Sequence, residues 1–440
     1  SAFELGRHVI GYEVQKVLAA VEWFSRGGTK IGVMGWGEGG LIALYAGALD
    51  TRFDAVCVSG YFDSRQNVWQ EPIERNVFGL LDEFGDAELV SMVVPRTLII
   101  EAAKGPEVVV PAGTRAAPGR LVTPEIADVR SELQRLKRLI AGSTFATDVR
   151  LIVSADGDGP CGTNETLEMF LQSLAGAKVV PSGEAPRRLV ESFDLDGRQE
   201  RQVHEIDRHN QLLLSESAYV RRQFFSKLDT SSTEKFARTI EWYRRHFYEE
   251  VIGKFDYDLL PPNVRSRRSY EGAGYRGYEV VMDVFPDVIA YGILLVPRGI
   301  AKGERRPVVV CQHGLEGRPQ SVVTGGSRAY RDYAAKLAER GFVTFAPQNL
   351  YIFKDRFRTL QRKANPIKKT LFSVIVPQHQ QILNWLCSLP YVDPGRIAFY
   401  GLSYGGKTAM RVPPLVGLSL IHISEPTRPL YISYAVFCLK

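Results

Sequence analysis

The segment with the clearest chemical potential is Gly401-Leu402-Ser403-Tyr404-Gly405, a G-x-S-x-G pattern. It follows an apolar run typical of a strand, residues 396–400, and precedes small residues typical of a helix start. The two flanking glycines allow a sharp turn that holds the serine in a strained, exposed conformation. The N-terminus of the following helix favours negative charge at this point. We therefore predict that Ser403 is a catalytic nucleophile, the alternative being a serine that only shapes the turn.

The same pattern occurs once more near the N-terminus, with a different central residue. Residues 29–44 repeat the outline of residues 395–410, and Gly37 stands where Ser403 stands in the later copy. Glycine has no side chain that could attack a substrate, and Glu38 is one residue beyond the apex, so its side chain is expected to point away. A sharp strand-to-helix turn that exposes a nucleophile is called a nucleophile elbow. We therefore interpret the first copy as a degenerate elbow in which neither Gly37 nor Glu38 is catalytic.

Both elbows belong to alternating strand and helix patterns. In the first half, short apolar runs at residues 53–62, 95–105 and 148–160 are typical of buried strands, and amphipathic helical patterns separate them. In the second half, residues 275–299 indicate a hairpin, and residues 306–312 indicate a buried strand that runs into His313-Gly314. This alternation predicts an α/β fold with a mostly parallel sheet flanked by helices.

The chain resembles tandem-domain α/β-hydrolases of the dienelactone hydrolase and acetyl-xylan-esterase-like group. Three stretches carry the resemblance: CQHGLEGRPQ (311–320), RIAFYGLSYGGKTAMR (396–411) and residues 71–102. The resemblance implies a serine-dependent carboxylic ester hydrolase that acts on small-molecule or carbohydrate-linked esters, with Ser403 as nucleophile. It further implies that the Tyr404 amide and the Gly314–Leu315 backbone form an oxyanion hole and that His313 shapes the oxyanion loop.

The resemblance also predicts how the chain is organised. Residues 1–225 are expected to be the C-terminal part of a catalytically degenerate α/β-hydrolase domain, and residues 226–265 a helical linker. Residues 266–417 are expected to be the N-terminal part of a second such domain. In this fold the acid and the histidine follow the serine in the chain, so both partners of Ser403 are expected beyond Gly417. The chain itself is therefore expected to be an inactive fragment.

The last 23 residues, 418–440, differ in character from the rest of the sequence. From Leu418 to Leu439 the sequence resembles, residue for residue, a translated sequencing-library adapter. We therefore expect residues 418–440 to be a non-native tail, and we assign no function to His422 or Cys438.

Composition excludes several classes of function. The net charge of +6 is mild, and the basic cluster at residues 265–268 is too short to indicate nucleic-acid binding. No apolar run has the length of a membrane span, and five scattered cysteines form no metal or disulfide pattern. His204 and His209 would not share one face of a helix. We expect no metal and no organic cofactor, and the sequence does not reveal the compartment or the oligomeric state.

Two other functions stay open at this point. Gly37 favours a pseudo-hydrolase that binds a ligand or partner without chemistry. A prolyl-oligopeptidase-like serine peptidase shares the G-x-S-x-G elbow, although no propeller repeats are present in the sequence. A more remote arrangement would combine the two halves into one site, with Glu101 and His204 or His209 as partners of Ser403.

Overall fold

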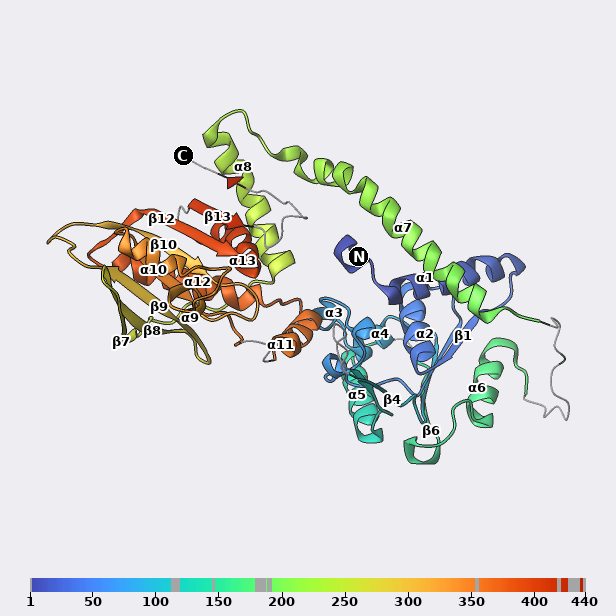
Figure 1. Cartoon of the computed structure of the whole chain (residues 1–440). Helices are drawn as coiled ribbons and strands as arrows, with labels where there is room; N and C mark the ends of the chain where they lie inside the picture. Colours follow the sequence, from blue (N-terminus) through green and yellow to red (C-terminus); the bar gives the residue numbers. More distant parts are fainter. Residues whose placement is uncertain are drawn as a thin grey trace. The chain divides into compact units, whose positions relative to one another are not determined.

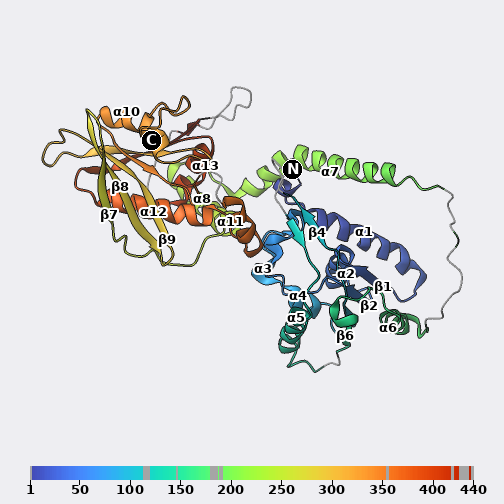
Figure 2. The ribbon, with the colours of Figure 1, turned by 60° about the horizontal axis from the view of Figure 1, so that its bottom comes forward.

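The chain divides into two compact units in its computed structural model. The model describes residues 2–111, 119–144, 147–178, 187, 192–352, 356–417, 421–425 and 436–437. Unit 1 comprises Ser1–Lys227 and Asn365–Lys368, and unit 2 comprises Leu228–Ala364 and Lys369–Lys440. Each unit has its own sheet and its own hydrophobic core, and each combines strands with helices (Figures 1 and 2). The predicted α/β class is confirmed.

Unit 1 is built on a four-stranded sheet in the order β1-β2-β3-β6, and all of its neighbouring strands pair in parallel. Its strands are β1 (Gly32–Trp36), β2 (Ala55–Ser59), β3 (Thr97–Ala102) and β6 (Val149–Val153). A separate hairpin is formed by β4 (Val108–Val110) and β5 (Gly119–Leu121). The central strand β2 is buried along its whole length, as is expected when helices cover both faces of a parallel sheet.

Helices cover the two faces of this sheet unequally. One face carries α1 (Val9–Phe24), α2 (Glu38–Leu49), α4 (Asp86–Ser91) and α5 (Ile126–Leu139), which share the main core of the unit. The other face carries α6 (Asn164–Ala175), which packs over Cys57, Ile99 and Ile152. Figure 1 shows α2 and α6 on opposite sides of the strands. The unit also contains the short helix α3 (Leu80–Glu83) and the long, mostly exposed helix α7 (Leu195–Phe224).

Unit 2 has a larger, mixed sheet in the order β14-β13-β12-β10-β11-β9-β8-β7. The strands are β7 (Arg265–Glu271), β8 (Tyr275–Phe285), β9 (Val288–Pro297), β10 (Arg306–Gln312), β11 (Val343–Pro347) and β12 (Val392–Leu402), with β13 (Ile421–Glu425) and β14 (Val436–Phe437). Strands β7 to β9 pair antiparallel, and β11, β10 and β12 pair in parallel. The predicted hairpin at residues 275–299 is therefore confirmed, with Pro286 and Asp287 between its strands.

Helices also cover both faces of the sheet of unit 2. On one face, α9 (Gln320–Val323) and α10 (Tyr333–Glu339) enclose a core with Ile293, Leu295 and Val309. On the other face, α12 (Phe372–Ser388) and α13 (Tyr404–Arg411) enclose a larger core. Figure 2 shows α10 and α12 on opposite sides of the strands. Unit 2 also contains α8 (Thr233–His246), the π-helical turn at Phe247–Ile252, α11 (Phe357–Ala364) and a short 3-10 helix at Pro413–Leu415.

The predicted domain boundaries and the non-native character of residues 418–440 stay predictions. The backbone of β13 pairs in parallel with β12, and β14 pairs antiparallel with β13. Residues 418–420, 426–435 and 438–440 lie outside the described part of the chain. None of the helices that the structure describes combines the length and the apolar character that crossing a membrane requires.

Candidate active site

Ser403 occupies the tight turn between β12 and α13. Its backbone adopts φ 61° and ψ −117°, a conformation that is costly for a residue with a side chain. Close packing leaves room only for glycine at positions 401 and 405, on either side of Ser403. A Cβ on Gly401 would lie 2.1 Å from the Gly405 carbonyl oxygen, and a Cβ on Gly405 would lie 2.4 Å from the Gln312 carbonyl oxygen. The turn therefore has the backbone geometry of a nucleophile elbow.

The first elbow has the same backbone conformation. Gly37 lies between β1 and α2 with φ 57° and ψ −116°. Gly35 is as tightly packed as Gly401, because a Cβ there would lie 1.9 Å from the Gly39 carbonyl oxygen. The repeat that the sequence indicates is therefore also present in the backbone, although only the second copy carries a side chain at the apex.

The space above Gly37 is filled. A Cβ on Gly37 would lie 2.6 Å from Cδ and 2.7 Å from Cγ of the Pro106 ring. The neighbouring Glu38 is also engaged, because its Oε2 accepts a hydrogen bond of 2.6 Å from Nε of the buried Arg75. Sequence reasoning did not identify Pro106 or Arg75 as relevant to this elbow, and no local signal could have done so, since both are distant from it in the chain.

His313 lies at the end of β10, in the loop that adjoins the second elbow. Its ring is fully buried, and burial lowers its pKa to about 4. Nδ1 is 2.7 Å from the Gly314 carbonyl oxygen, and Nε2 is 3.5 Å from the Gln348 side-chain nitrogen. A neutral ring that donates from Nδ1 and accepts at Nε2 satisfies both contacts. This arrangement suits a residue that shapes the loop and does not suit a general base.

The loop that contains Gly314 lies against the turn at Ser403. A Cβ on Gly314 would be 3.2 Å from Cβ of Ser403. The amide of Gly314 donates a hydrogen bond of 2.8 Å to the Tyr330 hydroxyl, so this amide is already engaged. Among the described residues, no hydrogen-bond acceptor is recorded for the amides of Leu315 and Tyr404. These two amides are therefore not engaged within the described part of the chain, and the hydrogen bond between Gly314 and Tyr330 is a contact that the sequence did not reveal.

The described residues do not supply an evident acid and base for Ser403. Its hydroxyl has no recorded hydrogen bond within the described part of the chain. His379, on α12, is fully buried beside Phe399, with ring centroids 5.2 Å apart, and burial lowers its pKa to about 3. His204 and His209 lie on α7 of unit 1, where the Tyr12 hydroxyl is 2.8 Å from Nδ1 of His209.

Glu101 has a structural environment at the end of β3. The residue is 1% exposed, and its carboxylate accepts hydrogen bonds from the Ser59 and Thr166 hydroxyls, both at 2.5 Å. It also accepts from the amides of Gly162 and Thr163, at 2.8 and 3.0 Å. Burial acts to raise the pKa of Glu101, but these hydrogen bonds together outweigh it and hold the pKa below its usual value. Glu101 therefore holds the turn before α6 and does not face a nucleophile.

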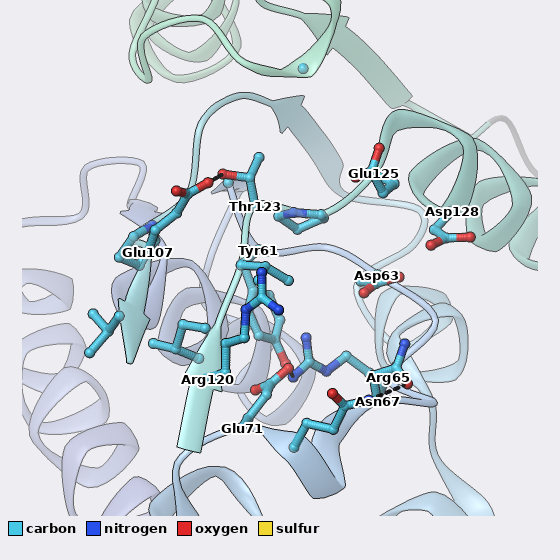
Figure 3. Close-up of a pocket in the computed structure, with 18 of the residues that line it drawn as sticks. Tyr61, Asp63, Arg65, Asn67, Glu71, Glu107, Arg120, Thr123, Glu125 and Asp128 are labelled. Carbon is cyan, nitrogen blue, oxygen red and sulfur yellow. Dashed lines mark hydrogen bonds and ion pairs between the residues drawn. The ribbon is translucent and has the colours of Figure 1, made fainter. Parts of the chain in front are cut away.

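A cavity of about 660 Å³ lies in unit 1 beside the first elbow (Figure 3). Its lining comes from the segments that follow β2, β3 and β6, and from the β4–β5 hairpin. Pro106, which fills the apex above Gly37, also lines this cavity. Among the described residues, no group of three or more histidine, cysteine, aspartate or glutamate side chains has a geometry that could hold a metal ion.

The comparison with protein families places one match in unit 2. Residues 299–419 match the model of the Dienelactone hydrolase family. The matched segment includes His313, Gly314, Leu315, Ser403 and Tyr404. No curated protein matches the chain significantly.

Solved structures give weaker similarities. A candidate acetyl xylan esterase from Bacteroides fragilis is 18% identical, with a TM-score of 0.37 over 42% of this chain and 52% of that one. An acetyl xylan esterase from Paenibacillus sp. R4 is 22% identical, with a TM-score of 0.29 over 36% and 51%. A glucuronoyl esterase from Solibacter usitatus is 14% identical, with a TM-score of 0.30 over 41% and 56%. The chain thus spans about half the length of the structures that it matches. Over residues 299–419, unit 2 is thus similar to the Dienelactone hydrolase family, the group that the sequence resembles.

Proposed function

We propose that unit 2 carries the nucleophile of a serine-dependent carboxylic ester hydrolase that acts on small-molecule or carbohydrate-linked esters. One observation carries the proposal: Ser403 has the strained backbone of a nucleophile elbow and lies directly beside the Gly314 loop. The family match over residues 299–419 supports the same class of reaction. If position 403 only shaped a turn, glycine would suit it better than serine. Glycine adopts this conformation at no steric cost, as Gly37 does.

The arrangement suggests how the reaction would proceed. The Ser403 hydroxyl attacks the ester carbonyl while a base accepts its proton, and the amides of Leu315 and Tyr404 donate to the developing oxyanion. The alcohol leaves, and water then hydrolyses the acyl-enzyme. We propose that the acid and the histidine of the site are supplied by natural sequence that follows Gly417, as the usual chain order of the triad requires.

The test compares the chain with a version that carries the natural sequence after Gly417. We expect the extended protein to hydrolyse 4-nitrophenyl acetate and to be labelled by a fluorophosphonate probe. Ser403→Ala should abolish the labelling and lower kcat by about a thousandfold or more. The 440-residue chain should show no turnover above its own Ser403→Ala variant, because the proposed base follows Gly417.

A matched control is Ser388→Ala, which removes an exposed hydroxyl at the end of α12 in the same unit. This variant should keep full labelling and full turnover. Hydrolysis by the extended protein that survives Ser403→Ala would refute the assignment of the nucleophile. Ser403-dependent turnover by the 440-residue chain would refute the proposal that the acid and base lie beyond Gly417.

A second function is favoured for unit 1 by a specific observation. The Pro106 ring occupies the space that a nucleophilic side chain at position 37 would need. We propose that unit 1 is a non-catalytic copy, so the pseudo-hydrolase alternative applies to this unit and the esterase proposal to unit 2.

A further inference from the structure

The cavity of unit 1 lies at the carboxyl ends of its parallel strands. This is the edge at which α/β proteins bind ligands, because the loops that follow the strands converge there. Gly60, Pro106 and Asp156 represent the loops after β2, β3 and β6 in its lining. The volume of about 660 Å³ is within the range of small-molecule sites. The cavity therefore lies beside an elbow that has no side chain at its apex.

One side of the cavity presents carboxylates. Asp63, Glu125 and Asp128 lie together there, as Figure 3 shows, and none of them forms an ion pair that is recorded among the described residues. Burial raises the pKa of Asp63, and repulsion from Asp128 adds to the shift, which indicates that the two carboxylates are close. One Asp63 oxygen accepts from the Ser64 amide. The other carboxylate oxygens on this side offer acceptors to a ligand.

The other side of the cavity combines Arg120 with Glu71 and Glu107 (Figure 3). Arg120, from β5, lies across from the three carboxylates and has no recorded ion pair within the described residues (Figure 3). Arg75 is 6% exposed, and although its other nitrogens bind Glu38 and Glu71, its Nη2 has no hydrogen-bond partner among the described residues. Because Nη2 of Arg75 is itself buried, the exposed Arg120 is the donor that a ligand on this side can reach.

The rest of the lining includes apolar side chains that are unusually exposed. Val109 is 75% exposed and Val122 is 55% exposed, and both belong to the hairpin region beside the cavity. A ligand that covers these side chains would remove apolar surface from water. Its chemistry should thus combine apolar faces with groups that both donate and accept hydrogen bonds.

We propose that unit 1 binds a neutral polyhydroxylated ligand, a mono- or oligosaccharide, in this cavity. A sugar hydroxyl donates to a carboxylate and accepts from an arginine, so one ligand satisfies both sides at once. The C–H faces of a sugar ring can pack on the exposed valines. A cation would use only the carboxylates, and an anion only Arg120. The proposal does not depend on Ser403, which belongs to the other unit.

The test is binding to the full chain. Saturation-transfer NMR and calorimetry are run with cellobiose, maltose and xylobiose as neutral sugars, spermidine as a cation and inorganic phosphate as an anion. We expect at least one disaccharide to bind saturably, and Asp128→Asn and Arg120→Gln each to weaken it by about tenfold. Both residues are exposed, so folding should be retained, and thermal melts verify it.

The controls are Asp196→Asn and Arg201→Gln, which change exposed residues on α7 of the same unit and should leave binding unaltered. Ser403→Ala should also leave binding unaltered, so this test and the test of the esterase proposal can fail separately. The proposal is overturned if no disaccharide binds, if only spermidine or only phosphate binds, or if disaccharide binding is unchanged in both lining variants.

Discussion

At the scale of single residues, the two elbows differ at one position of a shared backbone. Gly37 and Ser403 agree within a few degrees in φ and ψ. This conformation is sterically strained for Ser403, which has a side chain, and unstrained for Gly37, which has none. A strained side chain is retained where it has a task, which is the physical reason to locate chemistry at Ser403 and not at Gly37.

Restoring a serine at the first elbow should fail to restore a nucleophile. In Gly37→Ser the new Cβ would overlap the Pro106 ring at 2.6 Å and would hold a side chain at φ 57°. We expect the free energy of unfolding of unit 1 to fall by about 2–4 kcal/mol, with no fluorophosphonate labelling at position 37. Denaturant unfolding and mass spectrometry of the probe-treated variant measure the two effects.

The matched control for this prediction is Gly39→Ala, two residues further along. Gly39 lies in the first turn of α2, and a Cβ there would meet nothing within 4 Å. Because alanine is a better helix former than glycine, we expect a gain of about 0.5–1 kcal/mol. Equal stability of the Gly37→Ser variant and the parent would show that Pro106 does not block the apex.

At the scale of elements, one carboxylate fixes how α6 begins. Glu101 extends from the end of β3 and accepts hydrogen bonds from Gly162, Thr163 and Thr166 around the start of α6. Amide groups at a helix start have no partner within the helix, and an anion there is favoured by the helix dipole. The strand and the helix are thus joined by one buried charge.

Glu101→Gln should weaken this junction. An amide nitrogen in place of one carboxylate oxygen would face N–H and O–H donors, and we expect unit 1 to lose about 2–3 kcal/mol at pH 7. The measurement is urea unfolding at several pH values. Glu107→Gln is the control, because Glu107 is exposed after the same strand, and its variant should change stability by less than about 0.5 kcal/mol.

The pH dependence gives this prediction a second readout. The pKa of Glu101 is lower in the folded protein than its usual value. Its contribution is therefore fully present above the unfolded pKa of about 4.3 and is lost as the pH falls through the folded pKa. The difference between the parent and Glu101→Gln should shrink in acid. A difference that does not shrink as the pH is lowered would contradict an ionised Glu101.

The edges of the two sheets are protected differently. In unit 2 the edge strand β7 carries Arg265, Arg267 and Arg268, and almost all of its residues are exposed. Charged side chains of this kind discourage pairing with another chain. In unit 1, β1 pairs only with β2 among the described strands, and its sequence GVMGW has no charged residue. Its outer backbone groups are therefore an unprotected edge within the described structure.

At the scale of the whole molecule, the two units contain the same strand–elbow–helix segment at different places in their order of strands. In unit 1 the elbow follows the first strand of the sheet, and three further parallel strands come after it in the chain. In unit 2 the elbow follows β12, after five earlier strands. The repeated segment is thus early in one unit and late in the other.

The unprotected edge of β1 should make the 440-residue chain associate with itself. We expect its mass in solution to rise with concentration, because exposed strand edges pair with other chains. Size-exclusion chromatography with light scattering over a dilution series measures this. A single monomeric species of 49.2 kDa at all concentrations, with one cooperative melt, would contradict the prediction.

The sequence by itself determined the features that depend on neighbouring residues. The glycine spacing specified both elbows, and the alternation of apolar strands with helices specified the α/β class, because short-range sterics and periodicity control local backbone geometry. The hairpin around Pro286 and Asp287 was predictable for the same reason. The family resemblance of the second elbow also rested on contiguous residues.

Only the tertiary structure decided what surrounds these elbows. Pro106 closes the apex above Gly37, Tyr330 engages the Gly314 amide, and Thr166 binds Glu101. Each of these contacts joins residues that are distant in the sequence, and its geometry depends on how strands and helices pack. The cavity of unit 1 has the same origin, because loops from three strands meet there only after the sheet has formed.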